Sequence, residues 1–489
     1  MIETAWFTLW QATLSTVLTV LVALPGAYLY ARYGFRGRRV LWALTIVPFV
    51  LPTVVVGAAF LALLGPRSPF GLRLEHTIWA ILLAHIFYNY AVVLRIVGGF
   101  WAQLDPRLET AARMLGASPW AAFRHATLPL LRPAIASAAS IVFLFTFTSF
   151  GVVLLVGGPQ FATLEVEIYR QTAQLLDLRA AATLALVQLA ALCALLLVYS
   201  RYQQSAAVRG RLLVGRWQGK PVRTGAERVF VALNLVLVGA LLGLPLLVMV
   251  ERSLAGDGGY SLANYTSLFD ASARGALFVP PIEAVGNSLL FAAAAAAACL
   301  VLGSLAAAVI AYRRDWLAHG FDALLTLPLG TSAVIIGFGF LISLGSLPID
   351  LRVSPALIPI AHTLVALPFV IRATTPVMRA VDHRLREAAA VLGASPAQAW
   401  RLVDLPIVGR ALLIGAGFAF AVSLGEFGAT LFIVRPDTPT MPVAIFRLLS
   451  QPGSLAFGQA MAMATLLMLL TAVAVLLFDR VRSPASAGL

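Results

Sequence analysis

The chain has 489 residues, of which 60% are hydrophobic and only 11% are charged, and its net charge is +14. Soluble proteins carry about 25% charged residues, so this composition excludes an ordinary soluble domain and indicates a polytopic membrane protein whose apolar runs are helices rather than barrel strands. The basic excess is explained by arginine-rich loops on the cytoplasmic side, so no nucleic-acid partner is expected.

About eleven membrane helices are expected along the chain. Their approximate bounds are 5–30, 40–64, 77–99, 132–156, 179–200, 228–250, 285–311, 321–345, 355–376, 408–433 and 458–478. Segments 31–39 and 201–228 are rich in basic residues, whereas 157–169 and 251–272 are not. The positive-inside rule therefore predicts an outer N-terminus and a cytoplasmic C-terminus. The first ten residues lack a basic region and a cleavage site, so no removable signal peptide is expected.

One polar segment occurs twice. LGASPWAAFRHATLPL at 115–130 is matched 277 residues later by LGASPAQAWRLVDLPI at 392–407. The repeat predicts three parts: a first half at 1–205, a basic cytoplasmic linker at 206–227 and a second half at 228–489. The extra helix near 228–250 makes the two five-helix units parallel, related by a pseudo-twofold axis along the membrane normal. Both repeated segments then lie in cytoplasmic loops, at about 103–130 and 378–407.

Each loop is expected to form two short helices with a break between them. Gly116 can adopt the left-handed conformation that ends the first helix. Ser118 is a natural N-cap, with Pro119 at the first helical position. Trp120 and Phe123 then share one face, which suits a knob that fits a partner's groove. Pro129 is expected to end the second helix, and the second copy repeats Gly393, Ser395, Pro396, Trp400 and Pro406.

The segment EAAAVLGASP at 387–396 resembles the signature of permease subunits of ATP-binding-cassette importers. The resemblance implies an all-α polytopic membrane protein with the type I importer fold, in the plasma (inner) membrane of a bacterium. It further implies that a coupling helix in each loop docks on one of two identical cytoplasmic ATPase subunits, and that an external binding protein delivers the substrate. In the first copy Thr110 stands where Glu387 would be, and Glu109 is displaced by one residue. The two ATPase contacts are therefore expected to differ.

No catalytic role is expected for this chain. It has no Walker A pattern, so ATP and Mg²⁺ would be bound by the separate ATPase. No His/Cys spacing typical of a metal site occurs, and no nucleophile–base pair is evident. The main alternative of another class is an ion-coupled secondary transporter. That alternative predicts several acids inside the helices, of which Glu426 is the clearest of very few.

The whole chain resembles permeases in which both halves are fused, and the closest groups transport thiamine or ferric iron. The segments at 81–89 and 149–169 look more like the thiamine group, which is the expected function; ferric iron is the first alternative. Thiamine-type permeases usually carry one more N-terminal helix, so two alternatives stay open: this chain starts after that helix, or its start codon is misassigned. Sulfate, polyamine and phosphonate permeases stay open, because an external binding protein sets much of the specificity in this class.

Five residues are candidates for the substrate pathway: His85, Tyr88, Asn89, His362 and Glu426. The two histidines occupy equivalent positions in the two halves, whereas the others have no polar equivalent except Ser149 opposite Glu426. A carboxylate in a membrane helix is costly unless it is hydrated or paired, and it would suit a cationic substrate. The structural alternative is that the histidines are ordinary buried groups. In that alternative Glu426 pairs with an arginine or accepts backbone hydrogen bonds at a helix break.

Overall fold

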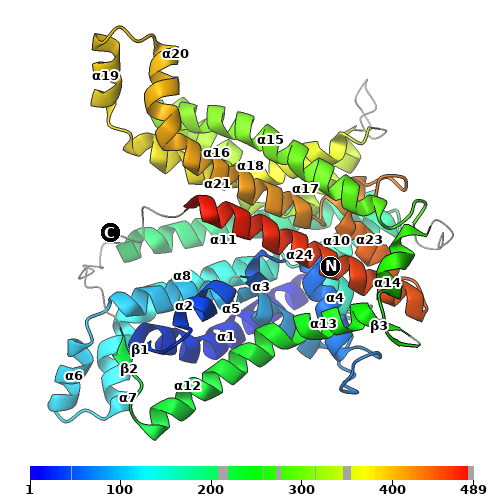
Figure 1. Cartoon of the computed structure of the whole chain (residues 1–489), viewed down its shortest axis with the longest axis horizontal. Coiled ribbons are helices and arrows are strands. Elements are labelled where there is room, and N and C mark those ends of the chain that lie inside the picture. The colour runs from blue at the N-terminus through cyan, green and yellow to red at the C-terminus, as the bar shows by residue number, and fades with distance from the viewer. Residues whose placement is uncertain are drawn as a thin grey trace. The chain divides into compact units, whose positions relative to one another are not determined.

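The computed structural model describes residues 1–45, 47–207, 219–256, 258–270, 277–313, 315–344 and 354–482. The chain divides into two compact units. The first consists of Met1–Val50, Ala59–Gln171 and Asp177–Met249, and the second of Leu51–Ala58, Thr172–Leu176 and Val250–Leu489. Helices dominate both units, and the expected all-α polytopic fold is confirmed (Figure 1).

The described residues up to 254 are mostly helical. Their elements are α1 (Ile2–Arg32), β1 (Tyr33–Gly34), α2 (Arg38–Leu44), α3 (Val47–Val50), α4 (Thr53–Leu64), α5 (Ile78–Gln103), α6 (Arg107–Met114), α7 (Pro119–Ala122), η1 (Phe123–Thr127), α8 (Leu128–Phe147), α9 (Gly151–Val156), α10 (Leu164–Ala173), α11 (Leu178–Ala207), β2 (Lys220–Pro221), α12 (Gly225–Val238), η2 (Gly239–Gly243) and α13 (Leu244–Leu254).

The core of the first unit is built from α1, α5 and α8, which pack on one another. Small residues allow the close approach: a Cβ atom at Gly98 would lie only 3.3 Å from the Cα of Ala27, and such contacts are typical of helices packed in a membrane. The short strands β1 and β2 pair in parallel and bring the end of the linker beside α1. Helix α12 also packs against α1.

The remaining elements begin at residue 255. They are β3 (Ala255–Gly256), β4 (Gly259–Tyr260), α14 (Ala263–Thr266), η3 (Ser267–Phe269), α15 (Glu283–Tyr312), α16 (Trp316–Gly330), α17 (Ala333–Ser343), α18 (Leu357–Ala380), α19 (His383–Val391), α20 (Pro396–Ala399), η6 (Trp400–Asp404), α21 (Leu405–Gly425), α22 (Thr430–Ile433), α23 (Met441–Leu449) and α24 (Ser454–Arg482). Helices α15, α18 and α21 pack together as α1, α5 and α8 do in the first unit.

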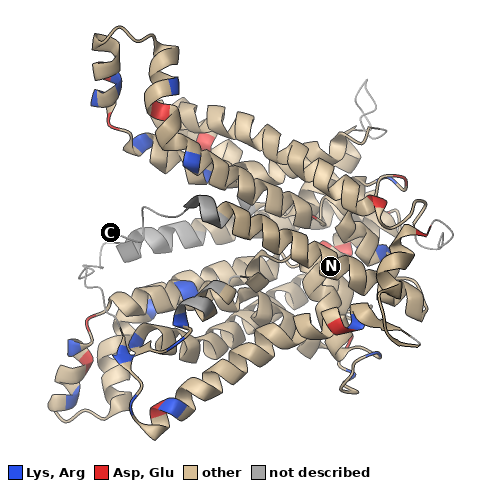
Figure 2. Ribbon diagram, in the orientation of Figure 1, with Lys and Arg blue, Asp and Glu red and all other residues tan. Residues whose placement is uncertain are grey.

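The described residues contain nine helices that are long and apolar enough to cross a membrane, or ten if the bent pair α16–α17 is one span. This is close to the expected eleven. The difference lies at 40–64, where α2, α3 and α4 replace one continuous helix. Pro52 disfavours helical geometry at Leu51, so α3 ends just before it. The equivalent pair α16–α17 is bent by 97°, so both halves interrupt this span. Charged side chains gather mainly near helix ends (Figure 2).

Candidate coupling loops and buried polar centres

The break in the first repeated loop has the expected capping chemistry. Gly116 adopts φ +92° after α6, a left-handed conformation that glycine reaches without a steric penalty. Its N–H donates to the carbonyl of Arg113, and the N–H of Ala117 donates to the carbonyl of Ala112, both at 3.1 Å. These two bonds form a Schellman motif. Ser118 then caps α7 by accepting the N–H of Ala121 at 3.2 Å, with Pro119 in the first turn.

The second loop repeats this turn. Gly393 adopts φ +86°, and the two Schellman bonds recur at 2.9 Å each. Ser395 accepts the N–H of Gln398, whose side chain accepts the N–H of Ser395, so this copy has a complete capping box. Pro396 again lies in the first turn. The predicted helix–break–helix geometry is therefore confirmed in both loops.

The expectation that Pro129 ends the second short helix is wrong. The chain passes from α7 through the π-turn η1 into α8 without leaving helical geometry, and Leu128 has φ −59° and ψ −41°. The N–H of Leu128 donates to the carbonyl of Phe123, five residues back. Proline has no N–H and its ring clashes with the carbonyl four residues back in an α-helix. The π-turn changes the hydrogen-bond register just where that donor is missing. Pro406 follows η6 in the same way.

The aromatic side chains of the loops face differently from one another. Phe123 stacks on Trp101 of α5, with ring centroids 5.7 Å apart, and Trp400 packs against a buried cluster of its own half that includes Met378. These two equivalent residues therefore anchor each loop to its own half. Trp120 keeps 67% of its surface exposed, and alanine occupies the equivalent position 397.

The most exposed apolar side chains of the loops were not singled out from the sequence. Met114 and Leu115 are 84% and 90% exposed, and the equivalent Val391 and Leu392 are each 87% exposed. Within their units, α6–α7 and α19–α20 project beyond the long helices, and these residues lie at the turns (Figure 1). Large apolar groups exposed at a projecting turn are typical of a docking surface. The repeated Leu-Gly pair before each break was the available signal.

The candidate acids of the two loops have different surroundings. Glu109 lies 3.7 Å from the guanidinium of Arg32, and Thr110 bonds the carbonyl of Pro106. Glu387 is exposed and lies 3.7 Å from Nε2 of His383. Its neighbour Arg386 makes a bidentate pair with buried Asp404. These bonds raise the pKa of the Arg386 guanidinium further above its already high range, by stabilising its charged form.

His85 lies at the centre of a buried polar group in the first unit. Its Nδ1 is 2.9 Å from Oγ of Ser15 on α1, and its Nε2 is 2.8 Å from Oγ of Ser149 at the end of α8. Asn89 donates to the carbonyl of His85 one turn back. Tyr88 is half-buried, and its ring lies 5.7 Å from that of Phe49. The histidine thus connects α1, α5 and the break that follows α8.

His362 is the equivalent residue in the second unit, but its two ring nitrogens face α21 and the start of α22. Its Nδ1 is 2.7 Å from Oγ of Ser423, and its Nε2 is 2.8 Å from Oγ1 of Thr430. Glu426, only 5% exposed, lies 3.4 Å from the same Nε2. Its carboxylate accepts the backbone N–H groups of Ala429 and Thr430 at 2.8 and 2.9 Å, as well as the Thr430 hydroxyl. It therefore caps α22 at the break after α21.

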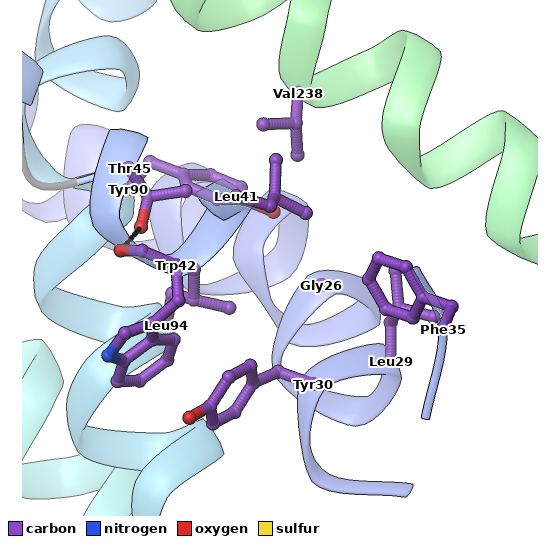
Figure 3. Close-up of a pocket in the computed structure, with 10 residues that line it drawn as sticks. All are labelled: Gly26, Leu29, Tyr30, Phe35, Leu41, Trp42, Thr45, Tyr90, Leu94 and Val238. Carbon is purple, nitrogen blue, oxygen red and sulfur yellow. Dashed lines mark hydrogen bonds between the residues drawn. The ribbon is translucent and has the colours of Figure 1, made fainter. Parts of the chain in front are cut away.

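These contacts agree with the structural alternative for Glu426, namely backbone hydrogen bonds at a helix break. Its part in a pathway stays a prediction, as does that of the two histidines. A small cavity between α1, α2 and α5 has a volume of about 20 Å³ and is lined mainly by apolar groups such as Leu29, Leu41 and Leu94 (Figure 3). That volume holds about one water molecule, so this cavity is too small for an organic substrate.

Known proteins resemble the chain over nearly its full length. The model of the family "Binding-protein-dependent transport system inner membrane component" matches residues 16–209 and again 299–484. The thiamine transport system permease protein of Brucella abortus is 30% identical over 97% of this chain and 87% of its own length. That of Escherichia coli is 28% identical over 95% and 86%.

A third relative matches over a shorter stretch. The molybdenum transport system permease protein of Azotobacter vinelandii is 33% identical over 31% of this chain and 70% of its own length. The two family matches correspond to the two units that carry the repeated loops, and the apolar helices make the chain a multi-pass inner membrane protein. The chain therefore belongs to the family of binding-protein-dependent transport system inner membrane components, and it is a transport permease rather than an enzyme.

Proposed function

We propose that the chain supplies both halves of the membrane-spanning permease of an ATP-driven importer for thiamine. The choice of thiamine as the substrate rests on the similarity to thiamine permeases over 97% of the chain. The shorter molybdenum relative covers only 31% and supports the transporter class without favouring its own substrate. The ferric-iron alternative has no comparable support among these relatives.

Two copies of a cytoplasmic ATPase dock on the two loops in this proposal. The support is the repeated break at Gly116 and Gly393, which presents exposed Leu115 and Leu392 at the same point of each loop. ATP and Mg²⁺ belong to the ATPase, and an external binding protein delivers the substrate from the other side. The arginine-rich segments support an orientation with the loops, the linker and the C-terminus in the cytoplasm and the N-terminus outside.

In this proposal the five polar candidates mark membrane helices that the translocation route passes. Among these candidates Tyr88 is the one with a partly accessible side chain. Glu426 and the two histidines act on the route chiefly by holding the breaks after α21 and α8 in place, because their polar atoms bond within their own halves.

The test is uptake by the permease reconstituted in proteoliposomes with its ATPase and binding protein. We expect ATP-dependent accumulation of labelled thiamine, which excess unlabelled thiamine abolishes and ferric iron leaves unchanged. Uptake of ferric iron instead would support the alternative substrate. Accumulation driven by an ion gradient without ATPase would contradict the importer class and favour a secondary transporter.

A further inference from the structure

The two short helices that begin the cytoplasmic loops carry opposite charges at equivalent positions. Glu109 on α6 and Arg386 on α19 are 277 residues apart, the spacing of the whole repeat. Neither helix contains a buried residue, so apolar packing does not fix its orientation. The polar contacts of these two residues therefore have a large share in holding each helix against its half.

In the first unit the contact is made to Arg32, the last residue of α1. One guanidinium nitrogen lies 3.7 Å from the Glu109 carboxylate, and another donates to the carbonyl of Leu104 at 3.4 Å. Arg32 is nearly buried, with 7% of its side chain exposed. It thus joins α6 to the ends of α1 and α5 through one long ion pair.

In the second unit the charge is reversed and the contact is tighter. Arg386 donates from Nε to both carboxylate oxygens of Asp404, at 2.8 and 3.0 Å, and from Nη2 at 2.6 Å. It also donates to the hydroxyl of Tyr312, the last residue of α15, at 2.7 Å. Asp404 is only 3% exposed, and removing the partner of a buried charge is strongly destabilising. Asp404 lies in η6, so the bidentate pair joins the two short helices of the loop, and the bond to Tyr312 ties them to α15, the equivalent of α1.

We propose that Glu109 and Arg386 are positioning residues that transmit movement of each loop tip to the first core helix of its half. The second tie is the stronger, so the second loop transmits motion more faithfully than the first. This inference rests on the proposed function, in which an ATPase moves the loop tips. It does not require either residue to touch the ATPase.

The structural arm of the test is hydrogen exchange on the permease alone, in nanodiscs. Arg386→Gln should speed exchange in 383–392 about fivefold, while 357–380 keeps the wild-type rate. Glu109→Gln should speed exchange in 107–115 about twofold, because its ion pair is longer. Arg410→Gln removes an exposed arginine of the same unit and should change neither. If Arg386→Gln does not fold, Arg386→Lys tests the loss of the bidentate geometry.

The functional arm is thiamine uptake per ATP hydrolysed in the reconstituted complex. Arg386→Gln should lower this ratio about fivefold with ATPase binding retained, and Glu109→Gln about twofold. Arg386→Gln combined with Asp404→Asn should be no worse than the first change alone, because the two residues act as one contact.

Two failures are distinguishable. A wild-type complex without ATP-driven uptake would overturn the proposed function. The hydrogen-exchange rates would still test whether Glu109 and Arg386 hold their helices in place. Wild-type exchange in Arg386→Gln, or a wild-type uptake ratio in an otherwise active complex, would overturn the positioning role.

Discussion

At the scale of single residues, the buried polar groups of this chain are arranged in matched but unequal pairs. His85 and His362 both bridge a core helix to a helix break, yet Ser149 on one side is replaced by Glu426 on the other. An uncompensated carboxylate inside a membrane costs a few kcal/mol. The N–H groups at the start of α22 and the Thr430 hydroxyl supply the compensation, so the acid holds the break where a serine suffices in the first half.

Glu426→Gln should therefore act mainly by lowering the stability of the folded permease, and not by a direct effect on substrate transport. The amide replaces a charged acceptor of several hydrogen bonds, which costs about 1–3 kcal/mol and lowers Tm by about 3–6 °C. Thermal unfolding of the purified permease is the measurement. Glu283→Gln, an exposed acid of the same unit, should shift Tm by less than about 1 °C. Unchanged Tm with reduced uptake at equal expression would instead support a place for Glu426 on the substrate route.

A single substitution at Gly393 tests whether the geometry of the loop turn is needed for coupling to the ATPase. Alanine at φ +86° costs about 1–2 kcal/mol of backbone strain, which relaxes the turn and moves Leu392. Stimulation of the ATPase by the loaded binding protein should fall in Gly393→Ala. The control is Gly409→Ala on α21, where a Cβ meets nothing within 4 Å. Equal stimulation in both variants would mean that the turn geometry is not needed for coupling.

At the scale of elements, capping chemistry could be predicted and long-range contacts could not. Each of the two breaks, at Gly116 and at Gly393, is determined by residues that lie within four positions of one another along the chain. Local rules therefore suffice to predict it. The π-turns before Pro129 and Pro406 were missed because a proline signals a helix end more often than a change of register. The pair Arg386–Asp404 joins residues 18 positions apart, and nothing in a helical period identifies it.

Periodicity also could not tell which apolar residues of the loops face the permease. Phe123 and Trp400 were expected to meet a partner, but they pack on their own halves, and Leu115 and Leu392 are exposed instead. The direction of a side chain in a short helix depends on the register set by the preceding turn. The sequence does not give that register, because it depends on how the turn joins the two short helices of each loop.

Leu392→Asp should weaken binding of the ATPase. A leucine buried in a partner contributes about 1.5–3 kcal/mol, so we expect the Kd of the ATPase for this site to rise by at least about tenfold. Titration of nanodisc-embedded permease with the ATPase is the measurement. Leu262→Asp removes another exposed leucine, from the loop before α14, and should leave the Kd unchanged. An unaffected Kd in Leu392→Asp would exclude the loop tip from the docking surface.

At the scale of the whole molecule, the arginine distribution fixes the expected orientation, and one residue offers a direct test. Lys220 is the only lysine of the chain, and it lies in the linker beside Tyr33 with about half of its side chain exposed. A membrane-impermeant amine reagent added outside intact cells should leave Lys220 unmodified, as judged by peptide mass. The same reagent should modify it after permeabilisation, and Lys220→Arg provides the blank. Modification in intact cells would reverse the assigned orientation.

The repeat also sets the expected stoichiometry of the complex. The family model matches the chain twice, and each match contains one loop with the same break and the same exposed tip, so one chain is expected to offer two ATPase sites. Native mass spectrometry of the purified complex should therefore give one permease of 52.0 kDa with two ATPase chains. Leu392→Asp disables one tip and should shift the population toward a single ATPase, while Leu115→Asp should do the same from the other half. A complex of two permeases with two ATPases would contradict the two-site chain, since each polypeptide would then use only one of its loops.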